Sequence, residues 1–515
     1  MRILTEILQW LGIIFAGILI SFAHPFRFES YSHGNSFWTF IVASFGLLLL
    51  FPLILKEGRP VVRFLKGFTA GSIFYAICMY WVIHAISVFG GLPPLVATLI
   101  AASLWCYCGA YWGLWALISG SRMVLQEDGI WKLVSWASLW AALESVRQIM
   151  ISGFPWGELG FHFSYMPLVR ESVSVWGVHG LTFFWIFFIA SILYVDQVWP
   201  NRRERKIFIG IVISFVLVCV GARLSVSFYQ TDQQLKVALI QPNVEQELKW
   251  DPGQIGPITE RLLDMTSRAI EQKADLIVWP ETAYPRLVGA TQKQLPFSTN
   301  TPLLIGAVVR DGQTNRNSAL LVQGDQIIQR FDKAHLVPFG EYVPLQEILP
   351  FKKLVANVGD FKPGAWDQPL IEIQEKNLKI GPLICYEDIF NRSSVNLAKR
   401  GAQILVNMTN DAWYGTTSAQ FQHATMAEFQ SLQTFLPLVR ATNNGVSTVI
   451  SPLKREDQPS FQQSLSVHEV GVSSKPRKTF FVWTHPLMEW IWVLLFAMAV
   501  LWKRNPRKRR IFFRN

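Results

Sequence analysis

The sequence predicts a polytopic α-helical membrane domain of about eight spans joined to an α/β extramembrane domain. Hydrophobic residues make up 51% of the 515 positions, with 21 Trp and a mean hydropathy of +0.27, which is too apolar for an ordinary soluble enzyme. Apolar runs of roughly 20 residues, the length that spans a bilayer core, recur up to residue 226 and once more near the C-terminus. The interval 228–480 has no such run, and it alternates strand-like with helix-like segments. We therefore predict a membrane domain at 1–227, an extramembrane domain at 228–480, and a last span with a basic tail at 481–515.

The Lys and Arg residues of the short loops predict the orientation. The predicted spans are 5–23, 36–55, 65–88, 94–120, 130–149, 176–197, 206–226 and 483–502. Eight spans place every Lys/Arg-rich loop and the basic tail on one side, which marks the cytoplasm. We expect both termini to be cytoplasmic and the extramembrane domain to be periplasmic, on a bacterial inner membrane. The net charge of +11 then reflects topology, and the tail is expected to contact anionic lipid rather than nucleic acid.

The fifth predicted span contains Glu144 and Arg147, three residues apart on one helix face. Polar side chains within a membrane often mark functional sites. Near a helix end, however, long charged side chains can snorkel to the interface. We expect snorkelling for this pair.

The interval 228–480 has the pattern of a layered α/β or α+β domain of about 250 residues. Between 318–322 and 326–331, Gly324-Asp325 predicts a hairpin turn, and linkers are expected near 229–234 and 456–478. Strands are predicted at 236–243, 275–279, 303–309, 318–322, 326–331, 378–384, 403–408 and 446–450, and helices at 258–272, 393–400 and 418–435.

Three reactive side chains follow predicted strands: Glu281, Lys333 and Cys385. Acyl transfer through a thiol needs a base, which a carboxylate can be, and a donor for the oxyanion, which a lysine can be. A nearby lysine would also lower the thiol pKa. Cys385 is the only cysteine in 228–480, which excludes a disulfide within this domain. Taken one at a time, these residues fit a packing cysteine and two surface charges better than a catalytic role.

The local sequence around these residues resembles a known superfamily. The segments WPE at 279–281, PFGE at 338–341 following Lys333, and CYE at 385–387 together resemble the nitrilase superfamily. Its Glu-Lys-Cys triad acts on carbon–nitrogen and acyl bonds, and its fold is an αββα sandwich. With the membrane spans, the chain resembles the membrane-embedded branch of that superfamily, the apolipoprotein N-acyltransferase family. Further matching segments lie at 339–344, 410–415 and 440–445, and more loosely at 153–156.

The resemblance implies a role for each matching residue. Cys385 would be the nucleophile, Glu281 the base and Lys333 the oxyanion stabiliser. The supporting residues would be Glu341, Tyr386 and Glu387. Asn410, Trp413 and Tyr414 are separate candidates for substrate binding: Trp413 and Tyr414 could guide an acyl chain, although packing explains these two at least as well. His335 and His423 are expected to be structural.

The same resemblance implies the reaction. A phospholipid, typically phosphatidylethanolamine, would give an acyl chain to Cys385 as a thioester. The N-terminal amine of the diacylglyceryl-cysteine of an apolipoprotein would then accept it, completing lipoprotein maturation. We expect no cofactor, no metal and a monomer within membrane lipid. The apolar segment 345–355, together with Trp366, is equally compatible with a lid that dips into the lipid interface and with a loop that packs on the domain.

Two other functions are compatible with parts of the sequence. A membrane-tethered nitrilase-type amidase would use water as the acceptor and release a free acid. A transporter or scaffold would only bind ligands, and its function would survive replacement of Cys385.

Overall fold

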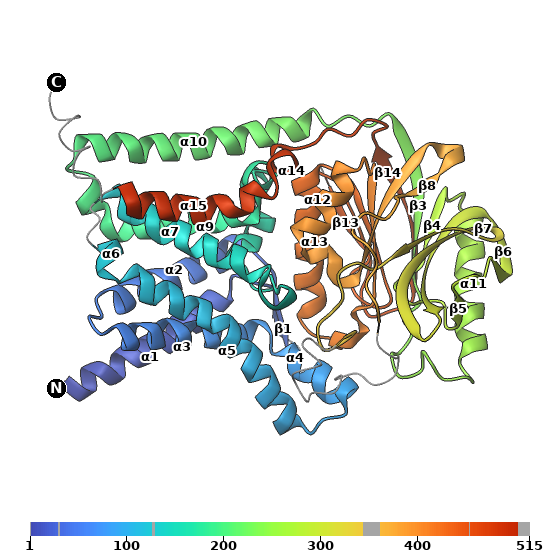
Figure 1. Cartoon of the computed structure of the whole chain (residues 1–515), viewed down its shortest axis with the longest axis horizontal. Helices are drawn as coiled ribbons and strands as arrows, with labels where there is room; N and C mark the ends of the chain where they lie inside the picture. Colours follow the sequence, from blue (N-terminus) through green and yellow to red (C-terminus); the bar gives the residue numbers. More distant parts are fainter. Residues whose placement is uncertain (1, 29–30, 126–128, 343–360, 453, 503–515) are drawn as a thin grey trace. The chain divides into compact units, whose positions relative to one another are not determined.

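The computed structural model describes the chain except residues 1, 29–30, 126–128, 343–360, 453 and 503–515. The candidate lid, the end of the motif at 339–344 and the basic tail therefore lie wholly or partly outside the described residues. The described chain forms two compact units (Figure 1). Unit 1 contains the described parts of 1–83, 94–223 and 484–502, and unit 2 contains those of 84–93 and 224–483. The segment 84–93 thus groups with unit 2, although it was predicted to belong to the membrane domain.

Unit 1 has a long helix at each of the eight predicted spans. Six of them are long and apolar enough to cross a membrane: α1, α2, α3, α5, α9 and α10. The other two are α7, which carries Lys132, Glu144 and Arg147, and α15, which is apolar but has only 16 residues. The eight helices are α1 (Arg2–Ser21), α2 (Phe37–Leu55), α3 (Pro60–Cys78), α5 (Pro94–Ser119), α7 (Ile130–Arg147), α9 (Val173–Val198), α10 (Arg202–Ser227) and α15 (Leu487–Trp502).

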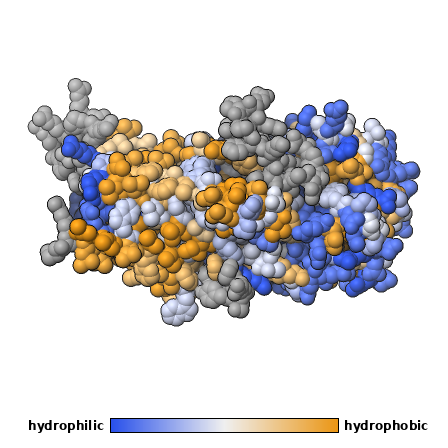
Figure 2. All heavy atoms as spheres, turned by 90° about the horizontal axis from the view of Figure 1, so that it is seen from below, coloured by the Kyte–Doolittle hydropathy of each residue, from blue (hydrophilic) through white to orange (hydrophobic). Residues whose placement is uncertain are grey.

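Local sequence sets where these helices begin and how closely they pack. Ser36 caps α2 in a capping box with Thr39, and Pro60 opens α3 at a position where its missing N–H costs nothing. Gly109 lets α5 approach α3, because a Cβ there would lie 2.7 Å from the backbone nitrogen of Ser72. Figure 2 shows hydrophobic side chains gathered on the outside of unit 1 and hydrophilic ones on unit 2.

Shorter elements connect the long helices. They are β1 (Phe26–Phe28), β2 (Tyr31–His33), α4 (Trp81–His84), the π-helical turn η1 (Ala85–Phe89), α6 (Arg122–Leu125), the 3-10 turns η2 (Met150–Ser152) and η3 (Leu159–Tyr165), α8 (Pro167–Arg170) and α14 (Phe480–Thr484).

Unit 2 contains two six-stranded sheets. In the first, β14-β3-β4-β6-β5 are neighbours in that order and β7 pairs with β6. In the second the order is β13-β12-β11-β10-β9-β8. The strands of the first sheet are β3 (Gln233–Gln241), β4 (Leu276–Val278), β5 (Leu287–Gly289), β6 (Gln294–Asp311), β7 (Thr314–Asp332) and β14 (Ser464–Val472). Those of the second are β8 (Ile371–Ile373), β9 (Leu378–Ile384), β10 (Ile404–Thr409), β11 (Leu438–Thr442), β12 (Thr448–Ile450) and β13 (Arg455–Asp457).

Helices cover the outer face of each sheet, so unit 2 is an αββα sandwich (Figure 1). On the first sheet α11 (Ile255–Glu271) buries Leu262 and Met265 against Ile277 and Trp279, while α12 (Asn391–Lys399) and α13 (Ala419–Thr434) pack on the second. The short 3-10 turns of unit 2 are η4 (Gln374–Lys376), η5 (Cys385–Ile389) and η6 (Asp411–Tyr414). The predicted fold class is confirmed.

Two local predictions were wrong, and one buried strand was not predicted. The hairpin expected at Gly324-Asp325 does not form, because strand β7 continues through these two residues. Gly324 has φ +62° and lies beside a shift in the pairing register of β6 and β7. The hairpin turn between β6 and β7 lies instead between Asp311 and Thr314. The linker expected at 456–478 contains β14, which pairs antiparallel with β3 from Ser464↔Gln241 to Val472↔Gln233. Strand β11 was missed, because the buried charge of Arg440 interrupts its apolar run.

Candidate active site

Cys385 occupies a strained position at the end of β9. It is the first residue of η5 and has φ 51°, a value that costs energy for a residue with a side chain and recurs at active sites. The neighbouring strand fixes it, because the Asn407 side-chain amide of β10 donates to the carbonyl oxygens of Leu383 and Cys385 at 3.2 Å each. The thiol is held at the carboxyl edge of parallel strands, where such sheets bind ligands.

Lys333 and two glutamates form a buried charged cluster. Lys333 follows β7, and its Nζ lies 2.9 Å from Oε2 of Glu341 and 3.4 Å from Oε1 of Glu281. The side chains of Lys333 and Glu281 are only 1% and 7% exposed. Asn317 of β7 joins the two carboxylates, donating from Nδ2 to Glu281 at 2.6 Å and to Glu341 at 3.0 Å. The structure thus brings together Glu281, Lys333 and Glu341, and it adds Asn317, which no local pattern in the sequence marks.

The protonation states of the thiol and the ammonium differ. Burial and the carboxylate of Glu281 raise the pKa of Cys385 well above its usual value, and the opposing effect of Lys333 does not compensate. The expected activation by Lys333 alone is therefore insufficient, and the resting thiol is protonated. Although burial opposes the charged form, Glu341 and Glu281 raise the pKa of Lys333. The site holds a permanent cation and needs a base for its thiol.

Glu387 joins the lysine segment to the cysteine turn. Its Oε1 accepts from the backbone nitrogens of Ala334 at 2.7 Å and His335 at 3.0 Å, and its Oε2 accepts from Ile384 at 2.8 Å. Burial raises the pKa of Glu387 to about 7, although these N–H groups act in the opposite direction. The carboxylate therefore ties Lys333 and Cys385 into one framework.

Tyr386 and His335 share an aromatic cluster behind the cysteine. The Tyr386 ring centroid lies 5.0 Å from that of Phe390 and 5.8 Å from that of His335, and the His335 ring stacks on Phe390 at 3.9 Å. Tyr386 is buried. These contacts fit a packing role for Tyr386 beside the nucleophile.

The three predicted substrate-binding residues lie in and before η6. Asn410 is buried, donates to Gln246 Oε1 at 2.6 Å and accepts from Asn443 Nδ2 at 3.1 Å, so its amide is engaged within the protein. Trp413 is partly exposed and packs edge-on against Phe89 of η1, with ring centroids 4.9 Å apart. Contact with substrate stays a prediction for all three.

A fully buried charged network lies behind the cysteine turn. His423 contacts Asp388 of η5 through Nε2 at 2.6 Å and Asp411 through Nδ1 at 2.9 Å. Arg440 contacts the same carboxylates, at 3.4 Å for Asp388 and 3.0 Å for Asp411. All four side chains are 0% exposed. In the part of the chain that the structure describes, no group of three or more His, Cys, Asp or Glu is placed to hold a metal ion.

This network makes stability depend on pH. Burial disfavours the charged imidazole, but Asp388 and Asp411 raise the pKa of His423 from 6.5 to about 9. A group whose pKa is raised by folding stabilises the folded state fully at pH values below its unfolded pKa. This stabilisation is lost as the pH rises through the folded pKa. We expect the melting temperature of the wild type to fall between pH 7 and pH 9, and His423→Gln to flatten that slope. Fluorescence melting curves of both proteins in detergent would show it, and parallel slopes would contradict it.

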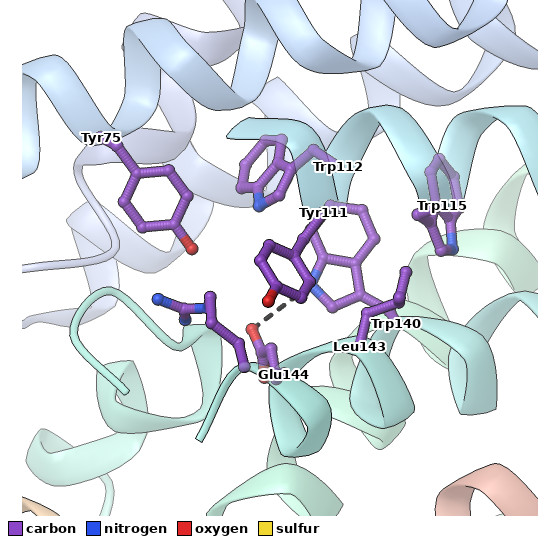
Figure 3. A pocket seen from close by; sticks show the side chains of 8 residues that line it. Tyr75, Tyr111, Trp112, Trp115, Trp140, Leu143 and Glu144 are labelled. Carbon is purple, nitrogen blue, oxygen red and sulfur yellow. Dashed lines mark hydrogen bonds between the residues drawn. The ribbon is translucent and has the colours of Figure 1, made fainter. Parts of the chain in front are cut away.

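Glu144 and Arg147 are buried in unit 1, so the snorkelling prediction was wrong. Arg147 Nη1 donates to the carbonyl oxygens of Phe154 and Trp156 at 2.8 and 2.6 Å. Glu144 accepts from Trp140 Nε1 at 3.3 Å, as the dashed line in Figure 3 marks. The end of α7 thereby holds the segment 153–156, because two carbonyl groups of that segment accept from Arg147. Both side chains line a small pocket whose other residues are Tyr75, Tyr111, Trp112, Trp115, Trp140 and Leu143.

Comparisons with known proteins agree with this architecture. The carbon-nitrogen hydrolase family matches residues 236–471, and the apolipoprotein N-acyltransferase N-terminal domain matches residues 16–192. An apolipoprotein N-acyltransferase of Geobacter metallireducens is 35% identical over 446 residues, which cover 81% of this chain and 83% of that protein. One from Azotobacter vinelandii is 31% identical over 489 residues, covering 91% and 92%.

Solved structures of carbon-nitrogen hydrolases are more distant. A member of the nitrilase superfamily from Saccharomyces cerevisiae has a TM-score of 0.35 and 16% identity, covering 47% of this chain and 91% of that one. A carbon-nitrogen hydrolase from Helicobacter pylori has a TM-score of 0.34 and 14% identity, covering 55% and 99%.

The αββα unit with a buried Glu-Lys-Cys set defines a carbon-nitrogen hydrolase domain of the nitrilase class, here in a chain with membrane-spanning helices. The similarity extends over both units. The chain belongs to the apolipoprotein N-acyltransferase family, and it is an acyltransferase of a bacterial membrane. Because the membrane half matches this family, the amidase alternative is not better supported than the acyltransferase assignment.

Proposed function

We propose that this chain transfers an acyl chain from a phospholipid to the N-terminal amine of a diacylglyceryl-apolipoprotein, through a thioester on Cys385. The observation that carries the proposal is the buried cluster of Lys333, Glu281 and Glu341, which Glu387 joins to the turn of Cys385. It supplies a base and a fixed cation, which are the two groups that acyl transfer through a thiol requires. Glu341 and Asn317 hold the cation and the base in place.

In the first step Glu281 takes the proton of Cys385 while Sγ attacks the ester carbonyl carbon of the phospholipid. The carbonyl π electrons move to oxygen, and the Lys333 ammonium stabilises this oxyanion. As the oxyanion collapses, the ester C–O bond breaks and the leaving oxygen takes the proton from Glu281. The products are the acyl thioester of Cys385 and a lysophospholipid.

In the second step the amine of the lipoprotein attacks the thioester carbonyl. Glu281 accepts a proton from the attacking nitrogen, and Lys333 again stabilises the oxyanion. Collapse breaks the C–S bond, and the thiolate takes the proton from Glu281. An amide forms and the free thiol returns, so protons and electrons balance without an external oxidant or reductant.

The membrane setting supports lipid substrates. Both have acyl chains that stay in a bilayer, and unit 1 has six helices able to cross one. We propose phosphatidylethanolamine as the donor, as the family resemblance implies, and a monomer as the working form. The bias of basic residues toward one set of loops supports a periplasmic unit 2 with both termini cytoplasmic.

Intact-mass spectrometry of the purified chain after incubation with phosphatidylethanolamine and no acceptor tests the proposal. We expect the wild type to gain one acyl chain that hydroxylamine removes, and Cys385→Ala to gain none. Addition of a diacylglyceryl-cysteine peptide should discharge the adduct onto the peptide. An untouched wild type, or discharge as free fatty acid while the peptide is present, would contradict the transferase assignment.

A further inference from the structure

Lys249 lies against the turn that carries Glu281, although it belongs to a loop far from it in the sequence. The loop joins β3 to α11, and the Lys249 side chain is buried at 3% exposure. Its Nζ donates to the backbone carbonyl oxygen of Glu281 at 3.2 Å and to Oγ1 of Thr282 at 2.6 Å. Both acceptors belong to the two residues at the turn after β4, so Lys249 contacts the main chain of the proposed base.

This turn is strained and tightly enclosed. Thr282 has φ 46°, an unfavourable value for a β-branched residue. Gly306 of β6 also lies against this turn, and an added Cβ there would stand 2.6 Å from the Thr282 nitrogen and 2.7 Å from the Glu281 Cα. The turn keeps a conformation that the chain would not adopt alone, so it needs contacts that hold it. Lys249 supplies two of them.

Lys249 also brings positive charge that no carboxylate neutralises directly. Among the described residues Lys249 forms no salt bridge, and its two acceptors in this turn are a carbonyl and a hydroxyl. Burial lowers the pKa of Lys249 to about 8, while the titratable groups acting on it, Glu281 and Cys385, raise it. A buried ammonium is costly without a favourable field. The carboxylate of Glu281, which the same turn carries, provides that field.

We propose that Lys249 is a positioning residue for the acyl transfer, which holds the Glu281 turn and places a second cation behind the base. Lys333 and Asn317 orient the Glu281 carboxylate, and Lys249 fixes the backbone that bears it. The inference rests on the proposed function of Glu281, because a turn that bears no base needs no such alignment.

A double-mutant cycle on the full-length chain in phosphatidylethanolamine-containing micelles tests this role. The readout is the rate constant of thioester formation on Cys385, followed by intact mass at several pH values and lipid concentrations. We expect Lys249→Met to lower this rate constant about 10- to 100-fold with an unchanged half-saturating lipid concentration, since misalignment by about 1 Å has such effects. Thr282→Val should lower the rate constant a few-fold. The double variant should be no slower than Lys249→Met, because both substitutions remove the same contact.

The pH dependence separates positioning from mere folding. A carboxylate that loses a nearby cation is harder to deprotonate, so the acidic limb of the rate profile should move to higher pH in Lys249→Met. Lys249→Arg keeps the positive charge, so the acidic limb of its rate profile should lie at the same pH as in the wild type, even if its rate constant is lower. The exposed Lys293→Met is the matched control and should behave as wild type.

Three results would overturn the inference: an unchanged rate in Lys249→Met, additive losses in the double variant, or losses that follow only the folded fraction with no shift in pH profile. A wild type that forms no thioester would refute the proposed function and this inference together. A wild-type thioester with any of those three results would refute only the role of Lys249.

Discussion

Lys333→Met is expected to lower the rate constant of thioester formation by about 10³-fold, the upper range for loss of one oxyanion donor. Two effects act together. The tetrahedral oxyanion loses its cation, and the carboxylates of Glu281 and Glu341 stay joined by Asn317 with no positive charge between them. Without the ammonium, the like charges of the two carboxylates repel each other, so the cluster no longer holds the base in place. Burst-phase intact mass with phosphatidylethanolamine measures the rate constant directly.

The matched control is Lys379→Met. Lys379 lies on β9, the strand that leads to Cys385, but its side chain is 46% exposed and meets Glu372 at 3.4 Å on the surface. Its replacement should leave the rate constant within about twofold, because exposed ion pairs contribute little. If Lys333→Met, folded by its melting curve, forms the thioester as fast as this control, Lys333 is not the oxyanion stabiliser.

The ends of buried strands were predictable from the sequence. Apolar runs at 276–278 and 378–384 stop at a polar or reactive residue, and parallel strands bring such ends to one edge. The sequence could therefore place Glu281 and Cys385 each at the carboxyl edge of a sheet, but it did not show that β4 and β9 belong to two different sheets. The membrane helices were predictable for a similar reason, since the bilayer fixes the length of an apolar run.

Pairings that depend on distant partners were not predictable. Arg440 is a charged residue within a strand, and in the sequence it interrupts the apolar run that would predict one. Only the structure shows that Asp388 and Asp411 neutralise it. Asn317 sits within β7 and Lys249 within a loop, and neither position carries a local pattern that marks a site. The strand β14 finds its partner β3 more than 220 residues earlier, as the pair Ser464↔Gln241 shows. Periodicity describes burial along one segment, whereas these contacts join segments.

Arg440→Met is expected to destabilise unit 2 by about 3–5 kcal/mol, the range for breaking a buried ion pair from one side. Arg440 is fully buried, and its loss leaves Asp388 and Asp411 with His423 as their only cation in the network. It also removes a hydrogen bond of 2.8 Å to the carbonyl oxygen of Val446. For a domain of this size the melting temperature should fall by about 10 °C.

The double variant Arg440→Met/Asp411→Asn distinguishes a charge effect from a packing effect. Neutralising Asp411 should recover part of the lost melting temperature, because the imidazolium of His423 then pairs with the single remaining carboxylate of Asp388. The control Arg268→Met removes an exposed pair with Asp264 at 3.8 Å, and it should cost less than about 1 kcal/mol. Since Asp388 lies in the same 3-10 turn as Cys385, Arg440→Met should also slow thioester formation at temperatures where the protein is still folded. An Arg440→Met protein as stable as the Arg268→Met control would mean that the buried network does not hold the cysteine turn.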